Sequence, residues 1–247
     1  MTRLIFWDVD TLHDFMKREG KLYVAGAEEI IPVVRTLTEF AHDHHIPIVA
    51  SADNHDASDA EISDEPDWKT TFPPHCMRGT PGQLKIAETA LRDPLVIEPE
   101  PQDPGALAHR ILSHRGDFML HKHTVDVFSN ANTITLLRTL EPEAVVLYGV
   151  ATDFCDRHTV EGLLRHAPRS RLYLVTDAIR AIYPEEGERL VSGWRERGVQ
   201  TVESCEVTQG GLLDSVIHGT AGASPEPILR HNGSMVKRRF ARRPNQP

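Results

Sequence analysis

One cysteine stands where a nucleophile could be exposed at the end of a β-strand. Cys155 follows the apolar run 145–150 and a short link, and Thr159 then opens a helical pattern. A thiol on such a strand-to-helix turn points away from the sheet. It also lies close to a helix N-terminus, whose free N–H groups favour a thiolate and can hold an oxyanion. Cys155 is therefore a candidate nucleophile, and a buried, inert cysteine is the alternative on this segment alone.

Two kinds of ionisable side chain follow other strand-like runs and could serve that thiol. Asp10 and Asp14 come soon after the N-terminal apolar run, and Lys122 follows another short one. A carboxylate at a strand end can take the proton of a thiol and later activate water, whereas capping is the alternative for either aspartate. An ammonium group facing Cys155 would lower the thiol pKa and keep Asp10 ionised. A solvated surface lysine is the alternative.

A carboxylate and two imidazoles could form a metal site near a further strand end. Asp53 and His55 follow an apolar run that ends near Ala50, and His75 lies in a Pro-rich segment. One oxygen and two nitrogen donors suit a divalent Zn, Fe or Mn ion and leave positions for water or substrate. The Asp-x-His pair alone is a weak signal in a chain with 14 histidines. A fourth ligand could come from acidic residues among which the sequence does not choose: Glu61, Asp64 and Glu65.

The elements that must position these side chains alternate between strand-like and helical patterns. Apolar, β-branched runs predict strands near residues 4–7, 46–50, 144–150, 171–175 and, weakly, 201–207. Residues 28–41 and 185–198 carry apolar side chains near 3.6-residue spacing, as helices packed on a sheet do. The alternation predicts a parallel sheet in an α/β fold. The stretches 51–82 and 99–105, rich in Pro, Asp and Gly, predict loops over the carboxyl ends of the strands, where such sheets build their sites.

Composition narrows the class of protein. A chain of 247 residues with 40% hydrophobic content can bury a sizeable core without a disulfide or metal staple. Three cysteines cannot complete a disulfide framework, which favours a reducing compartment and predicts a cytoplasmic protein. The longest apolar run is far below the roughly 20 residues of a membrane helix, so we expect no membrane partner. A net charge of −9 argues against nucleic acid and favours a small-molecule partner.

The end of the chain differs in character from the rest. Residues 219–247 contain six Lys or Arg and one acidic residue, Glu226, and are rich in Gly, Ser, Pro and Asn. The sequence therefore predicts one domain over residues 1–218 and a basic, extended tail over residues 219–247 that is mobile or lies along another subunit. An anion-binding arm is the alternative for this tail.

Five segments in the same order resemble the isochorismatase-like cysteine hydrolases, most closely the nicotinamidases, over residues 4–207. The segment that begins at Asp10 resembles the Asp-x-Gln-Asn-Asp-Phe segment of that family, with Leu and His in place of Gln and Asn. Residues 72–82 resemble its Pro-His-Cys-x-x-Gly-Thr-x-Gly stretch, the most nicotinamidase-like feature of the chain. The other matches are the Asp-x-His segment at residues 53–55, the lysine segment with Lys122 and Phe128, and the nucleophile segment at residues 149–155.

The resemblance implies a three-layer, doubly wound α/β fold with a six-stranded parallel sheet and helices on both faces, commonly in a homo-oligomer. It implies a catalytic triad of Asp10, Lys122 and Cys155. It also implies a cis peptide before Ala151 that turns the N–H groups of Ala151 and Cys155 toward the oxyanion. In nicotinamidases one divalent metal ion binds the ring nitrogen of the substrate. The matching residues are Asp53, His55 and His75 for the metal, and Phe15, Phe72 and Phe128 for contacts with the substrate.

We therefore expect a metal-dependent cysteine amidohydrolase, most similar to a nicotinamidase, that converts nicotinamide to nicotinate and ammonia through a thioester. Another small amide, a ureido compound or isochorismate is the alternative substrate within this fold, because fold and triad do not define the substrate. A non-catalytic binding protein is a further alternative, which the intact Asp10, Lys122 and Cys155 disfavour.

Overall fold

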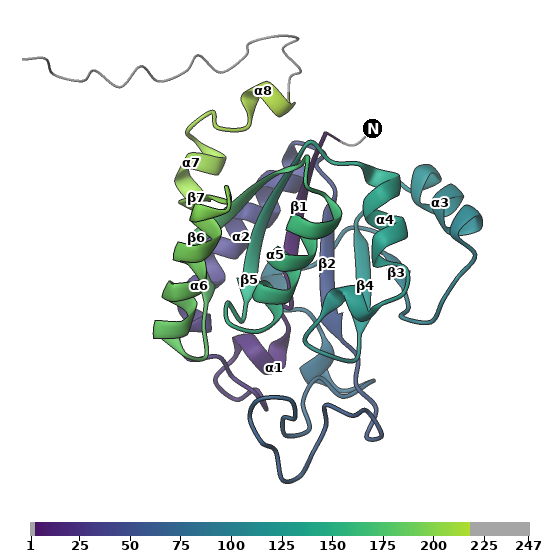
Figure 1. Ribbon diagram of the computed structural model, residues 1–247, viewed down its shortest axis with the longest axis vertical. Coiled ribbons are helices and arrows are strands. Elements are labelled where there is room, and N and C mark those ends of the chain that lie inside the picture. Colours follow the sequence, from purple (N-terminus) through teal and green to yellow (C-terminus); the bar gives the residue numbers. More distant parts are fainter. Residues whose placement is uncertain (1–2, 218–247) are drawn as a thin grey trace, which may run out of the picture.

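The computed structural model describes residues 3–217, so the boundary predicted at residue 218 and the basic tail 219–247 lie outside the described residues. A seven-stranded parallel sheet forms the centre, in the order β3-β4-β2-β1-β5-β6-β7 (Figure 1). The strands are β1 (Leu4–Val9), β2 (Ile48–Asp53), β3 (Leu95–Ile97), β4 (Phe118–Lys122), β5 (Ala144–Val150), β6 (Arg171–Arg180) and β7 (Gln200–Val202). Strands β2 to β4 extend the sheet on one side of β1 and β5 to β7 on the other, which creates a switch point between β1 and β5.

The expectation of six strands is wrong by one strand at an edge. The strand that the sequence did not predict is β3, which has three residues and pairs only with β4. Three residues are too few to show a periodic pattern. At the other edge, the strand expected over 201–207 ends at Val202, because Glu203 and Glu206 form a capping box that begins the helix α7 (Ser204–Thr208).

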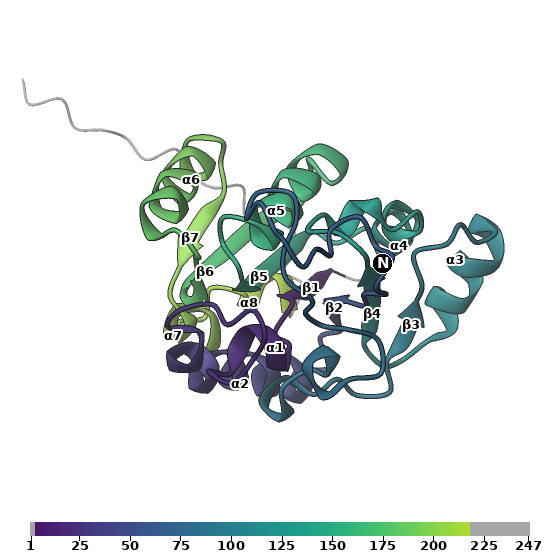
Figure 2. The same ribbon diagram turned by 90° about the horizontal axis from the view of Figure 1, so that it is seen from below.

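Helices cover both faces of the sheet, as the three-layer prediction requires (Figure 2). One face carries α1 (His13–Met16), α2 (Ala27–Asp43), α7 and α8 (Asp214–Ile217); the other carries α3 (Pro104–Ser113), α4 (Thr133–Leu140), α5 (Cys155–His166) and α6 (Pro184–Glu196). The helices predicted over 28–41 and 185–198 are confirmed as α2 and α6. Three short 3₁₀ helices lie in the loops: η1 (Pro81–Gln83), η2 (Ala87–Thr89) and η3 (Val127–Ser129). Within residues 3–217, no helix has both the length and the apolar character needed to cross a bilayer.

The central strand β1 is packed between helices on both faces of the sheet. Successive side chains of a strand point to opposite faces, so Leu4 and Phe6 pack in the layer of α2, whereas Ile5, Trp7 and Val9 pack in the layer of α4 and α5. All six residues of β1 are buried, because helices cover this strand on both sides. The strand ends are therefore held in fixed positions.

Side chains that can do chemistry gather at the carboxyl edge of the sheet, the lower edge in Figure 1. Asp10 follows β1 directly, and Asp53 and Lys122 are the last residues of β2 and β4 and are paired across these two strands. Strand β5 is followed by a cis peptide bond between Val150 and Ala151. Residues that are far apart in the chain thus meet at the carboxyl edge of the sheet, beside the switch point between β1 and β5.

Candidate active site

Lys122 lies at the centre of a buried cluster of acidic groups. Its Nζ atom is 2.9 Å from Asp10 Oδ2 and 3.6 Å from Cys155 Sγ, and it also donates a hydrogen bond to Asp53 Oδ1. Burial by itself would lower the pKa of Lys122, but Asp10 and Asp53 together raise this pKa well above its usual value. Lys122 is therefore a fixed cation that binds the acidic groups together.

This cluster is not a metal site. Oxygen atoms of Asp10 and Asp53 and the sulfur of Cys155 lie within 4.8 Å of one another, a spacing that an ion could bridge. The ammonium group of Lys122 already contacts all three and supplies the positive charge between them. A second cation there would meet strong repulsion in a buried environment.

Asp10 is held between the Ser51 hydroxyl and the Lys122 ammonium. It occupies the turn after β1 with a φ of 49°, which is uncommon for a residue other than glycine. Ser51 Oγ donates a 2.7 Å hydrogen bond to Oδ1, whereas Oδ2 lies beside the Lys122 ammonium and accepts no hydrogen bond from the described residues. Burial raises the pKa of Asp10, and Lys122 opposes this change. A carboxylate with a raised pKa, held beside the same lysine as the thiol, is suited to act as a general base.

Cys155 is the first residue of α5 and is only 6% exposed. Burial raises the pKa of its thiol well above the usual value, and the charge of Lys122 offsets only part of that rise. Lys122 does lower the thiol pKa, as expected, but desolvation of the thiolate raises it by more at this depth. The thiol is therefore protonated at rest and needs a base before it can attack.

Backbone N–H groups lie close to this thiol at the turn after β5. The cis peptide bond before Ala151, which the resemblance implies, is present. The N–H groups of Phe154 and Asp156 both donate to the carbonyl oxygen of Ala151. Cys155 contributes its N–H at the start of α5, where a helix offers no acceptor of its own. Ala151 and Cys155 thus stay our prediction for the groups that hold an oxyanion.

A second buried cluster adjoins the first through Asp53. Donor atoms of Asp53, His55, Glu61 and His75 lie within 4.8 Å of one another, and all four residues are buried. His55 Nε2 is 3.8 Å from Asp53 Oδ2 and 3.9 Å from Glu61 Oε1, and His75 Nε2 is 3.6 Å from Asp53 Oδ2. His55 Nε2 has no hydrogen-bond partner among the described residues although it is buried. An orphaned buried nitrogen that faces two carboxylates fits a metal ligand.

The remaining polar atoms of these side chains are held by neighbouring groups. His55 Nδ1 is 3.2 Å from Asp59 Oδ2, His75 Nδ1 bonds to Pro73 O at 2.8 Å, and Glu61 Oε2 accepts a 2.8 Å bond from Val125 N. Such contacts orient the other nitrogen or oxygen toward the centre of the cluster. Burial opposes the ionisation of Asp53, yet Lys122 and the two imidazoles hold its pKa well below the usual value. Asp53 is therefore ionised, as a ligand of a cation must be.

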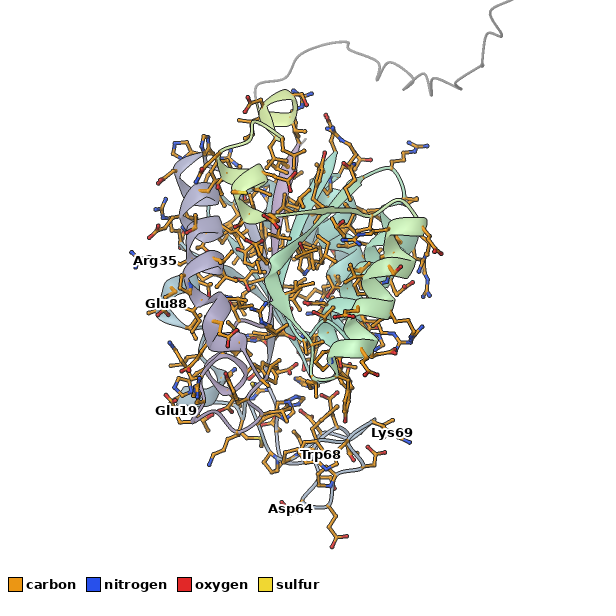
Figure 3. The ribbon with its side chains drawn as sticks, turned by 90° about the vertical axis from the view of Figure 1, so that its left-hand side faces the viewer. Glu19, Arg35, Asp64, Trp68, Lys69 and Glu88 are labelled. Atoms are coloured by element: carbon orange, nitrogen blue, oxygen red, sulfur yellow. The ribbon has the colours of Figure 1, made fainter. Side chains whose placement is uncertain are left out.

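Glu61 is the acidic residue that the sequence left undecided. It is 6% exposed and belongs to the cluster, whereas Asp64 and Glu65 are exposed. Asp64 lies at the far end of a protruding loop (Figure 3). Two carboxylates and two imidazoles form a mixed oxygen and nitrogen donor set that fits Zn, Fe or Mn.

Both clusters contribute to the wall of one small pocket, and most of its other lining is apolar. The lining consists of Phe15, Leu22, Val24, Asp53, Glu61, Phe72, His75, Val125, Ala151, Phe154, Cys155 and Ile182. The rings of Phe15 and Phe72 lie 5.4 Å and 6.2 Å from the His75 ring, measured between centroids. The pocket therefore brings apolar rings, the metal cluster and Cys155 to one lining, the combination of groups that a flat aromatic ligand would contact.

The structure does not bring Phe128 to this pocket, although the resemblance implies a contact with the substrate. Its ring stacks on Trp7 with 6.4 Å between centroids and on His166 with 5.2 Å. Gly162 packs against the same ring so closely that a Cβ atom there would lie 2.0 Å from it. Phe128 supports the core behind β1 and α5, so its role is packing.

The comparisons with known proteins agree with this geometry. The family model described as the isochorismatase domain matches residues 2–204. The chain belongs to the isochorismatase family. It is 28% identical over 167 residues to the nicotinamidase/pyrazinamidase of Mycobacterium tuberculosis, which covers 66% of this chain and 80% of that relative.

Solved structures in the isochorismatase family give a similar result. The pyrazinamidase of Pyrococcus horikoshii in complex with zinc has a TM-score of 0.62 at 25% identity and covers 81% of this chain and 99% of its own. The N-carbamoylsarcosine amidase from Thermoplasma acidophilum has a TM-score of 0.59 at 26% identity and covers 82% and 96%. The predicted resemblance to isochorismatase-like hydrolases and to nicotinamidases is therefore confirmed.

Sequence reasoning missed two contributors to this isochorismatase-family site. Phe154 lines the pocket. The signal in the sequence is an aromatic residue directly before the candidate nucleophile Cys155. Asp14, which the sequence offered as a possible base or a cap, accepts hydrogen bonds from the N–H groups of Lys21 at 3.0 Å and Cys76 at 2.7 Å. Asp14 thus ties the loop after α1 to the loop that carries His75, a contact between segments that no local pattern reveals.

Proposed function

We propose that the protein is a metal-dependent cysteine amidohydrolase that converts nicotinamide to nicotinate and ammonia through a thioester. The observation that carries the proposal is the set of contacts around Lys122, which touches Asp10 and Cys155 and also Asp53 of the metal cluster. A nucleophile and its base are therefore adjacent to a site for a substrate-positioning cation, and Cys155, Asp53 and His75 line the same pocket. A cytoplasmic location and a homo-oligomeric state stay predictions.

The first half-reaction forms the thioester. Asp10 takes the proton of the Cys155 thiol, and the sulfur attacks the amide carbon. The N–H groups of Ala151 and Cys155 stabilise the oxyanion that results. When the carbon–nitrogen bond breaks, Asp10 gives the proton to the leaving nitrogen, so that ammonia leaves and the acyl group stays on Cys155.

The second half-reaction regenerates the thiol. A water molecule gives a proton to Asp10 while its oxygen adds to the thioester carbon. The carbon–sulfur bond then breaks, the sulfur regains its proton from Asp10, and the carboxylic acid leaves. One water is consumed and one ammonia is released in each cycle. Lys122 stays protonated and lowers the cost of negative charge on Asp10 or Cys155.

The metal cluster would hold one divalent ion through Asp53, His55, Glu61 and His75. When bound, the ion supplies a Lewis-acidic position that can hold a ring nitrogen of the substrate. The rings of Phe15 and Phe72 lie close to the His75 ring, where they can stack on the aromatic ring of the amide. These residues orient the amide carbon toward Cys155.

The lining of the pocket favours a neutral aromatic amide over the alternatives. Among the described residues that line it there is no Lys or Arg, and its ionisable members are Asp53, Glu61, His75 and Cys155. Isochorismate and ureido acids carry carboxylates. In this pocket such a carboxylate would find no Lys or Arg side chain among the described lining residues to pair with. Hydrolysis of a ureido compound is the second candidate, because a relative 26% identical in sequence is described as an N-carbamoylsarcosine amidase.

The proposal is tested by measuring ammonia release from nicotinamide, benzamide and N-carbamoylglycine with the metal-loaded protein. We expect nicotinamide to have a kcat/KM at least about a hundredfold above that of benzamide, which has the same ring without the nitrogen. Faster release from N-carbamoylglycine would establish the ureido alternative. Equal values for nicotinamide and benzamide would contradict a role for the ring nitrogen, and no release from any amide would overturn the proposed reaction.

Replacing His75 by alanine is expected to weaken zinc binding by more than about a hundredfold, because it removes one of four donors. Competition with a chromophoric chelator measures this affinity. The KM for nicotinamide should rise in the same variant, while circular dichroism stays unchanged. The matched control is His109→Ala, which removes an exposed imidazole on α3. Zinc affinity equal to that of the wild type would exclude His75 as a ligand.

A further inference from the structure

A second hollow lies at the amino edge of the sheet, at the opposite end of the strands from the active-site pocket. Its volume is about 570 Å³, within the range of sites for small molecules. The lining comes from the start of β1, the link between α2 and β2 and the link between α3 and β4, all near the upper edge in Figure 1. Arg92, the last residue of α4 and the last two residues of α8 complete it. We call it the basic groove, after the cationic residues at its rim: Arg3, Arg92, Arg115, His44, His45 and His114.

The charge of the basic groove is opposite to that of the whole chain. The chain carries a net charge of −9, yet Asp117 is the only acidic residue among the described residues that line the groove. Its carboxylate is already engaged by His42 Nε2 at 2.8 Å, Ile48 N at 2.9 Å and Arg92 N at 2.7 Å. Asp117 is 3% exposed and its carboxylate oxygens are occupied by these donors, so they are not open to a ligand in the groove.

Two of the guanidinium groups form no ion pair with a carboxylate of the described residues. Arg92 donates to the carbonyl oxygen of His42 at 3.2 Å, and Arg115 donates to the carbonyl oxygens of Leu112 and His114 at 3.0 Å each. Within residues 3–217 neither group makes an ion pair with an Asp or Glu side chain. Each guanidinium has five N–H donors in a planar fork, so most of these donors remain available to an anion.

The remainder of the lining is apolar. It includes Leu4, Ile46, Ile111, Phe118 and Leu140, which form part of the two hydrophobic cores. Leu112, also in the lining, is 63% exposed and adds apolar surface at the rim. A ligand that fits this groove therefore has an anionic head for Arg92 and Arg115 and an apolar body for the adjoining surface.

We propose that the basic groove binds a small organic phosphate. A phosphate dianion matches two uncompensated guanidinium groups and the nearby imidazoles better than a carboxylate monoanion, because Arg forms bidentate, charge-assisted bonds with phosphate. The site is separate from the proposed amidase site: β1, β2 and β4 begin at or near the groove and lead to Asp10, Asp53 and Lys122 at their other ends. The proposal does not depend on the reaction assigned to that site.

Isothermal titration calorimetry with phenyl phosphate tests the proposal on the full-length protein. We expect saturable one-site binding that weakens with added salt, and weaker binding of inorganic phosphate, which lacks the apolar body, and of benzoate, which carries one charge. Arg115→Gln and Arg92→Gln should each weaken phenyl phosphate binding by about tenfold or more. The matched control is Arg35→Gln, on the outer face of α2 (Figure 3), which should leave binding unchanged.

Two outcomes would overturn the proposal. Benzoate binding as strong as that of phenyl phosphate would exclude recognition of a phosphate dianion. Phosphate can also bind a metal ion, so the titration is repeated with His75→Ala. Binding that is lost in His75→Ala but kept in Arg115→Gln would move the ligand to the metal cluster and remove it from the groove. Circular dichroism and urea unfolding of Arg115→Gln check that the variant is folded.

Discussion

Replacement of Cys155 by alanine is expected to lower kcat for nicotinamide by about 10⁴-fold or more. The variant loses the atom that carries the acyl group, so Asp10 and Lys122 have no nucleophile to serve. The metal cluster does not include this sulfur, so zinc content should stay at the wild-type level. Ammonia release and metal analysis of the same preparation measure both effects.

The control for the Cys155 experiment is Cys205→Ala, since Cys205 is exposed and lies on α7, away from the active-site pocket. It should turn over like the wild type. Acid quenching followed by mass spectrometry should detect an acyl group on Cys155 of the wild type. Turnover by Cys155→Ala that is comparable to the wild type would remove the thioester from the mechanism.

Replacement of Lys122 by methionine is expected to lower the free energy of unfolding by about 3–5 kcal/mol and to abolish turnover. Methionine fills a similar volume but leaves Asp10 and Asp53 buried near each other without their shared counter-charge. Urea unfolding of the chelator-treated proteins measures the loss of stability separately from metal binding.

A double variant identifies the cause of that loss. Asp10→Asn removes one of the two carboxylates, so adding it to Lys122→Met should cost less than the sum of the two single changes. The surface control is Lys17→Met, whose partially exposed pair with Glu88 at 3.6 Å should contribute at most about 1 kcal/mol. If Lys122→Met were as stable as the wild type, the buried carboxylates would not need this cation and the electrostatic account would fail.

Asp53 makes contacts in the fold that its sequence motif does not reveal. The sequence places it only in the metal segment, as the first residue of Asp-x-His. In the fold, its Oδ1 accepts a hydrogen bond from Lys122 and its Oδ2 faces His55 and His75. One side chain therefore joins the nucleophile cluster to the metal cluster, so a change at Asp53 should disturb both.

Several site residues could be found from the sequence because they lie at the ends of regular elements. Asp10, Asp53 and Lys122 end or follow strands of a parallel sheet, and Cys155 begins a helix. Such positions show as the ends of apolar runs, and parallel strands bring their carboxyl ends to one edge. Glu61 could not be separated from Asp64 in this way, because both lie in a loop and only burial distinguishes them.

The sequence by itself determined the parallel α/β sheet, the two helices predicted in advance and the residue types available at one edge. Periodic apolar patterns and local capping encode these features within a few consecutive residues. The tertiary structure alone decided that Phe128 packs in the core while Phe154 lines the pocket, and that burial keeps the Cys155 thiol protonated beside Lys122. These outcomes depend on desolvation and on contacts between distant segments, which arise only when the layers pack together.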